Sequence, residues 1–235
     1  MSVARLRALA ARAARSGDEG MTLVEVMLAS ILTLLCSGIL VASLIPFMTL
    51  ATSSRVHSTS TSEALIVFAR IDQEVRFADA INIQGLGASG GASASRYVEW
   101  RTPAESSPTH VTLCTQWRFD PTTRMIQERQ WNEGATPTST WTTRLTLAID
   151  KPNEVDGFGH KIYPFSMTSA STSENRPLQS LQIWVVAGDE DLNATTEIKT
   201  QFVARNSTIV APTNDNDNNG SSDGTPVCDP THNRP

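Results

Sequence analysis

The sequence predicts an α+β protein, in which a long N-terminal helix spans a membrane with its first half and packs on a mostly antiparallel β-sheet. Three observations predict this fold class. A long uncharged apolar run lies near the N-terminus, apolar residues then recur at helical spacing, and alternating apolar and polar residues fill most of the remaining chain. The apolar stripe of the helix and one face of the sheet would form a single core.

The length and charge of the chain limit its class. Its 235 residues suffice for one membrane segment and one medium-sized domain, and its formal net charge is −5. Residues 1–20 hold four arginines against two acidic residues, so the chain without this leader carries a charge of −7. Because an acidic chain does not attract nucleic acid through bulk electrostatics, we predict no direct nucleic-acid binding.

The apolar run predicts a single membrane span. No charged residue occurs from Val26 to Ser54, and a helix needs roughly 20 apolar residues to cross a bilayer. We therefore assign residues 21–50 as a transmembrane helix, with the basic leader in the cytoplasm and the soluble part outside. A cleaved secretory signal is the competing interpretation, but it predicts a shorter apolar core of about 7–15 residues with a small-residue cleavage site after it.

Residues 51–84 are predicted to form a linker and an amphipathic helix. The linker is rich in serine and threonine, and Ser60-x-x-Glu63 has the pattern of a helix-capping box. The apolar stripe that follows places a helix from near Glu63 to near Ala80, which either continues the membrane helix or restarts after a joint. The members of the stripe are Leu65, Phe68, Ile71 and Val75.

Residues 96–210 are predicted to form a β-rich globular domain. A glycine-rich loop at 85–95 precedes it and contains the G-x-G-x-x-G pattern, but a dinucleotide site needs a strand before this pattern and a helix after it. Asp120-Pro121 predicts the turn of a hairpin, and Pro164 restricts its strand to a sheet edge. The predicted strands are 96–101, 110–119, 124–131, 141–149, 162–167, 181–187 and 197–205.

The junction at residues 20–26, G-M-T-L-V-E-V, resembles the prepilin peptidase site of type IV pilins and type II secretion pseudopilins. The resemblance implies that residues 1–20 are a leader peptide that prepilin peptidase removes by cleavage after Gly20. It also implies that the new amine of Met21 is methylated, that Glu25 is the fifth residue of the mature chain, and that the apolar segment remains as an assembly helix.

Glu25 has two interpretations. A carboxylate buried in an apolar helix needs a partner or becomes neutral, and the amine that cleavage creates at Met21 of a neighbouring subunit could pair with it. Such a pair would set the register of assembly. Alternatively, Thr22-x-x-Glu25 is a capping box, in which Glu25 bonds a backbone N–H of its own helix. Both interpretations stay open at this point.

The order of elements is similar to that of minor pilins and minor pseudopilins of the larger J-like type, whose last strand ends in Arg-Asn, as residues 205–206 do here. The resemblance implies a structural subunit that initiates or caps a helical pilus or pseudopilus. Its implied partners are other minor and major pilins or pseudopilins, prepilin peptidase and a membrane assembly platform. Its implied location is the bacterial cytoplasmic membrane, with the C-terminal domain outside, and then a periplasmic or cell-surface filament.

The tail at residues 211–235 contains a candidate calcium loop with the pattern D-x-D-x-N-G-x-x-D. Calcium takes about six to eight oxygen ligands, which acidic residues around a glycine turn supply. The run resembles the calcium loops of dockerins and thrombospondin type 3 repeats, although runs of this composition are also common in disordered tails. The implied ligands are Asp215, Asp217, Asn219 and Asp223, together with the carbonyl oxygen of Ser221.

The three cysteines have different expected roles. Cys114 and Cys228 could form a disulfide if their part of the chain lies in an oxidising compartment. Cys36 lies in the apolar segment, where we expect a small buried side chain.

No residue pattern predicts an enzyme. The histidines lack ligand spacing and no nucleophile signature occurs, so an extracellular enzyme with a signal anchor has no supporting site. The remaining alternative function is a bitopic membrane protein that never polymerises and whose external β domain binds ligands. It would keep its leader.

Overall fold

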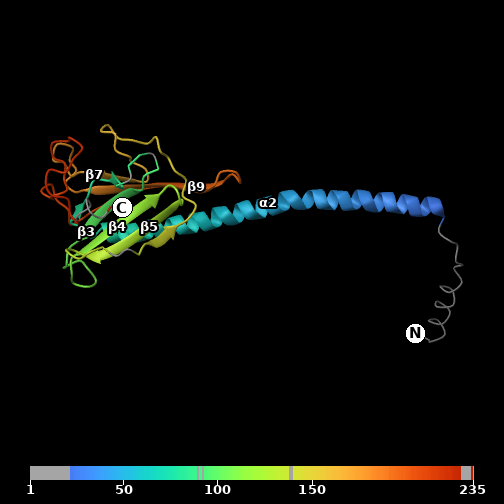
Figure 1. Cartoon of the computed structure of the whole chain (residues 1–235), viewed down its shortest axis with the longest axis horizontal. Coiled ribbons are helices and arrows are strands. Elements are labelled where there is room, and N and C mark those ends of the chain that lie inside the picture. The colour runs from blue at the N-terminus through green and yellow to red at the C-terminus, as the bar shows by residue number, and fades with distance from the viewer. Residues whose placement is uncertain (1–21, 89, 92, 138–139, 229–233, 235) are drawn as a thin grey trace, which may run out of the picture. The chain divides into compact units, whose positions relative to one another are not determined.

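The structure is a computed structural model, and it describes residues 22–88, 90–91, 93–137, 140–228 and 234. The chain divides into two compact units, residues 1–51 and 52–235. Helix α2 (Leu23–Val75) belongs to both units, and all described strands belong to the second. The fold is α+β, with one long N-terminal helix and antiparallel β-sheets (Figure 1).

In the first unit, α2 is long and apolar enough to cross a membrane. Its large apolar side chains between Leu23 and Leu50 are all exposed. The hydroxyl groups of Ser30, Thr33, Ser43 and Thr49 donate hydrogen bonds to carbonyls of their own helix, at 2.8 to 3.1 Å. Because these polar groups are satisfied locally, they do not prevent the helix from lying in lipid.

In the second unit, α2 is the continuation of the apolar first half and does not restart near Glu63. The helix continues without a break through the serine- and threonine-rich segment 51–62 and ends at Val75, before Ala80. The Glu63 carboxylate does not cap it, since that group accepts hydrogen bonds from the backbone N–H and the hydroxyl of Thr146, both at 2.8 Å. Residues 51–62, predicted as a linker, are therefore part of the helix, and of the two alternatives left open, the structure has the continuous one.

The buried stripe of this half of α2 is close to the predicted one. Its apolar members are Ala64, Val67, Phe68, Ile71 and Val75. Leu65 was predicted to belong to it but is 58% exposed, because the helical repeat that buries the later members turns position 65 away from the sheets.

The described strands form two sheets, where the sequence predicted one. The first sheet has the order β1-β3-β4-β5-β6, with β2 also paired to β3, and the second has the order β7-β8-β9. All pairs are antiparallel. The strands are β1 (Ala80–Ile81), β2 (Gly85–Leu86), β3 (Arg96–Thr102), β4 (Leu113–Asp120), β5 (Met125–Asn132), β6 (Thr142–Leu145), β7 (Phe165–Thr168), β8 (Ser180–Asp189) and β9 (Ala194–Val203).

Local chemistry explains where several strands begin and end. The predicted hairpin joins β4 to β5, and the Asp120 carboxylate accepts the backbone N–H of Thr122 at 2.9 Å in its turn. Strand β6 is shorter than predicted, because the chain leaves the first sheet near Leu147, whose φ is 56°. Strand β7 follows Pro164 and lies at an edge of the second sheet, as predicted.

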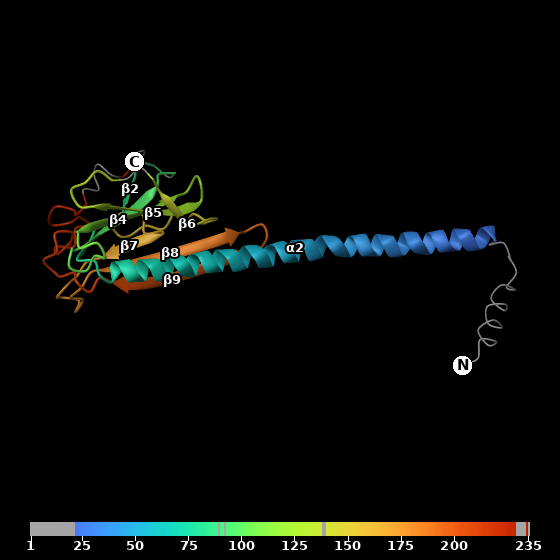
Figure 2. The same cartoon turned by 90° about the horizontal axis from the view of Figure 1, so that it is seen from below.

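One core joins α2 to both sheets. The second half of α2 runs alongside β8 and β9 (Figure 2), and the rings of Phe68 and Phe202 lie 6.1 Å apart there. Tyr163 links the two sheets through edge-to-face contacts with Phe119 on β4 and Trp184 on β8. Burial of each large apolar side chain contributes about 1.5–3 kcal/mol, so this core is the main source of stability. Its bulkiest members include Trp100, Trp117, Phe119, Phe165 and Tyr163.

A buried carboxyl group lies between α2 and the first sheet. Glu74 accepts hydrogen bonds from Gln130 at 3.0 Å and from the indole of Trp117 at 3.4 Å. Burial, followed by the nearby Glu128 carboxylate, raises the pKa of Glu74 to about 8, and the attraction of Arg70 does not offset this. The carboxyl group of Glu74 therefore keeps its proton to a higher pH than a solvent-exposed glutamate does.

We expect the stability of the second unit to fall as the pH rises from about 5 to about 8. The pKa of Glu74 is 4.5 in the unfolded reference and about 8 in the folded chain. Its contribution is thus fully present below 4.5 and is lost as the pH passes through 8. Each pKa unit corresponds to about 1.4 kcal/mol, so the loss is on the order of a few kcal/mol. Glu74→Gln should flatten this dependence in denaturant unfolding, and an unchanged slope would contradict the assignment.

Candidate functional site

The predicted processing site and the described helix meet at the start of α2. Gly20 and Met21 lie outside the described residues, and Thr22 is the first residue that the structure describes. The Thr22 hydroxyl accepts the backbone N–H of Glu25 at 3.3 Å, which is one half of the predicted capping box. Glu25 is exposed in the first turn of α2, and its carboxylate has no ion-pair partner within the described part of the chain.

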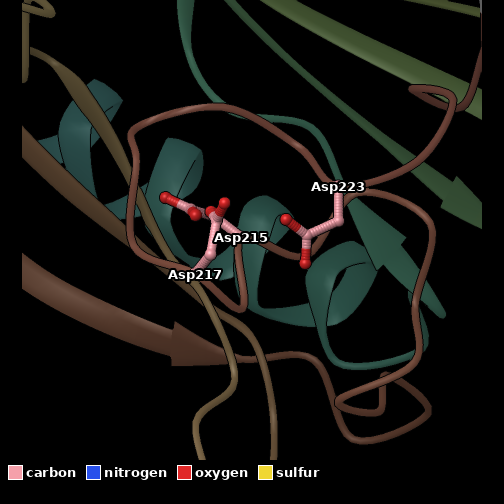
Figure 3. A group of neighbouring side chains, drawn as sticks. All are labelled: Asp215, Asp217 and Asp223. Carbon is pink, nitrogen blue, oxygen red and sulfur yellow. The ribbon is translucent and has the colours of Figure 1, made fainter.

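The structure brings together three of the predicted calcium ligands. Asp215, Asp217 and Asp223 each offer a carboxylate oxygen, and these oxygens all lie within 4.8 Å of one another (Figure 3). Asn219 lies beside them, but its amide nitrogen donates to Asp217 at 2.8 Å and its carbonyl oxygen accepts the backbone N–H of Ser221 at 2.8 Å. The side-chain oxygen of Asn219 is thus used within the loop.

Hydrogen bonds to the backbone fold this loop. The Asp215 carboxylate accepts the N–H groups of Asn219 at 2.9 Å and Gly220 at 2.8 Å, and Asp223 accepts that of Asn216 at 2.8 Å. Gly220 has a φ of 84°, and a Cβ there would lie 2.6 Å from the ring of Phe158. A glycine at this position lets the loop turn and lie against that ring.

The loop is attached to the segment just after β7 through Asn214, which is fully buried. Its side-chain oxygen accepts the backbone N–H of Ala170 at 2.7 Å, and its nitrogen donates to the carbonyl of the same residue at 2.9 Å. The side-chain amide thus bonds both the N–H and the C=O of one residue, as a neighbouring β-strand would. The base of the acidic loop is therefore fixed to the rest of the unit, unlike that of a disordered tail.

The donor set suits a hard divalent cation. Three carboxylates supply the oxygen chemistry that calcium prefers, and none of them forms an ion pair with a lysine or arginine among the residues described. Their mutual repulsion is thus not offset by a described cationic side chain. Asp215, Asp217 and Asp223 could thus each offer a carboxylate oxygen to one metal ion.

The structure links Cys114 and Cys228 by a disulfide, with their Cα atoms 5.7 Å apart. Cys114 is fully buried on β4, and the pair belongs to a second small core that attaches the tail to the first sheet. The other members of this core are Ala80, Trp131, Ala211 and Val227. Cys36, which was expected to be buried, is exposed on α2.

Sequence reasoning missed a polar cluster on the first sheet. Glu99 on β3 is fully buried and lies between Gln116 and the C-terminal Arg234. Strand alternation predicts an outward-facing carboxylate at this position, so nothing in the local sequence indicated its burial.

We compared the chain with protein-family models, curated proteins and solved structures, and none of them matches it.

Proposed function

We propose that this chain is a minor type IV pilin or pseudopilin, a structural subunit that initiates or caps a helical filament after prepilin peptidase removes residues 1–20. One observation carries the proposal. A single continuous helix, Leu23–Val75, exposes an apolar first half and carries one carboxylate, Glu25, in its first turn. The leader and cleavage motif immediately before this helix support the same conclusion.

Assembly would occur by helix packing. The exposed apolar side chains of the first unit would contact lipid before assembly and neighbouring helices afterwards. Within such a bundle Glu25 would lose its water, and an uncompensated buried charge is costly. The ammonium group that cleavage creates at Met21 of a neighbouring subunit would pair with Glu25 and thereby fix the axial register.

The same proposal places the chain in the bacterial cytoplasmic membrane with the β-rich unit outside. The basic leader favours a cytoplasmic N-terminus. The Cys114–Cys228 disulfide supports an oxidising compartment for the second unit. Other pilins or pseudopilins, prepilin peptidase and an assembly platform in the membrane would be its partners.

We expect Glu25→Ala to be cleaved and methylated normally but to enter filaments at least about tenfold less well. The substitution leaves the ammonium group of Met21 of the neighbouring subunit buried without a partner, and an unpaired buried charge costs ~3–5 kcal/mol. Thr22→Ala is the matched control. It removes the described N-terminal cap and keeps the carboxylate, so it separates subunit registration from helix capping. Quantitative immunoblots of sheared filaments measure the incorporation. Equal incorporation of Glu25→Ala and the unmodified chain would contradict the registration role.

We also propose that the loop at residues 215–223 binds calcium, an assignment supported by the three clustered carboxylates. The ion would supply the positive charge that the cluster lacks and would hold the loop closed. Asp215 and Asp223 would keep their backbone hydrogen bonds while they coordinate it.

Calcium is expected to release or absorb heat in titration calorimetry with the full chain in detergent. At a free concentration 100 times the Kd it should stabilise the fold by about 2.7 kcal/mol. Asp217→Ala should remove most of this effect, whereas Asp191→Ala, in the turn between β8 and β9, should retain it. Absence of any heat with the unmodified chain would end the calcium assignment.

A further inference from the structure

The buried carboxylate of Glu99 needs a countercharge. Glu99 lies in the middle of β3, between two residues that point into the main core, Val98 and Trp100, so it faces the opposite side of the first sheet. It is fully buried, and it accepts hydrogen bonds from the amides of Gln116 at 2.8 Å and Asn82 at 3.3 Å. Both amides are neutral, so their hydrogen bonds bring no positive charge. Arg129 attracts Glu99 electrostatically, and it donates to the carbonyl oxygen of Gln116 at 2.7 Å.

Arg234 supplies that charge in a bidentate arrangement. Its Nε lies 2.8 Å from one oxygen of Glu99 and its terminal nitrogen 2.5 Å from the other. The same terminal nitrogen donates to the carbonyl of Ile83 at 3.1 Å, and the backbone N–H of Ala88 donates to the carbonyl of Arg234 at 3.0 Å. Side chain and backbone of this arginine are thus both recognised.

Gly85 makes room for the guanidinium. A Cβ at this position would lie 1.9 Å from one terminal nitrogen of Arg234 and 3.0 Å from its central carbon. The backbone of Gly85 is not in the left-handed region, so an alanine could adopt its conformation. Glycine is therefore needed here because it leaves space for the arginine, and not because of its backbone freedom.

A groove of about 570 Å³ leads to this arginine. Residues around β2 form one wall, and the acidic loop with the segment after it forms the other. The lining includes Asn82, Gln84, Leu86, Ala88, Ser222 and Pro226.

We propose that Glu99, Gly85 and the Ile83 carbonyl form a recognition site for an arginine side chain, and that the segment of this chain after Cys228, which carries Arg234, is its ligand. Arg234 follows the disulfide-bonded Cys228 closely in sequence. A ligand on so short a tether has an effective concentration of about a millimolar or more. Modest intrinsic affinity is then enough to keep the site filled.

The charge state of the pair agrees with this assignment. Burial alone would lower the pKa of Arg234, but the Glu99 carboxylate more than offsets that effect, and the net direction is upward. The site therefore holds a charged guanidinium. A lysine could supply the charge but not two parallel hydrogen bonds.

A synthetic peptide tests whether the tail is a separable ligand. The chain is truncated after Cys228, kept otherwise complete in detergent, and titrated into a fluorescein-labelled peptide of residues 229–235 while anisotropy is recorded. We expect saturable binding, at least tenfold weaker binding of the peptide with lysine in place of arginine, and at least tenfold weaker binding to the full-length chain, whose own tail competes. Absence of binding by a truncated chain with native near-ultraviolet circular dichroism would overturn the proposal.

A second variant tests the site if the truncated chain does not fold. Gly85→Ala is made in the full-length chain, with a spin label on Pro235→Cys in a Cys36→Ser background. The added methyl group fills the guanidinium slot, so we expect the label to become mobile. Gly157→Ala is the matched control, because a Cβ at Gly157 would meet no atom within 4 Å. Equal label mobility in Gly85→Ala and the control would overturn the proposal.

Discussion

Replacing Cys114 and Cys228 together by alanine is expected to lower the free energy of unfolding of the β-rich unit by about 2–5 kcal/mol. The disulfide joins residues 114 positions apart in the sequence, and closing so long a loop removes much of the freedom of the unfolded chain. In the folded chain it also holds the tail against β4. There the Asn82 side chain exchanges two hydrogen bonds with the backbone of Val227, at 2.8 and 3.0 Å.

Thermal unfolding of the full chain in detergent, followed by near-ultraviolet circular dichroism, measures this effect. For a unit of this size each kcal/mol corresponds to about 2–4 °C, so the midpoint should fall by roughly 4–20 °C. Cys36→Ser is the control for loss of a thiol, because Cys36 is a free cysteine on α2. A midpoint that stays constant in the double variant would show that the disulfide contributes nothing to the fold.

The Gly20→Val variant is expected to accumulate as the unprocessed precursor, with its leader attached and no methyl group on Met21. The resemblance to prepilins places the cut immediately after this glycine, and a branched side chain there would not fit a peptidase that accepts glycine. Without cleavage no ammonium group forms at Met21 for Glu25 to meet, so filaments should lack the subunit.

Intact mass spectrometry of membrane fractions distinguishes precursor from product by the mass of residues 1–20. Gly17→Val is the matched control, because it makes the same change in the same leader away from the proposed cut. Normal processing of Gly20→Val would show that the cut, if there is one, lies elsewhere.

The sequence predicted the elements whose signals are local. Asp120-Pro121 predicted the β4–β5 turn because the Asp120 carboxylate accepts a hydrogen bond from the backbone of a residue in the same turn. The apolar repeat of Phe68, Ile71 and Val75 predicted the buried face of α2, because helical spacing alone decides which side chains align. The clustering of the acidic loop could also be predicted, since Asp215, Asp217 and Asp223 are close in sequence.

Features that depend on distant partners could not be predicted. Serine and threonine favour a linker at residues 51–62, yet this stretch is helical and contacts the β8–β9 hairpin, where the hydroxyls of Thr61 and Thr196 lie 2.8 Å apart. Glu63 has the local pattern of a cap, and its actual partner, Thr146, could not be read from that pattern because it lies 83 residues away. Glu99 and Arg234 are separated by 135 residues, so no local pattern could reveal their pairing.

We propose that proteolysis between Gly20 and Met21 converts this chain into an assembly-competent subunit. Intact mass and N-terminal sequencing of the protein purified from its native membrane test it most directly. Cleavage and methylation predict a chain that begins with N-methylated Met21 and lacks residues 1–20. A native protein that retains its arginine-containing leader would contradict the claim and favour a bitopic membrane protein that does not polymerise.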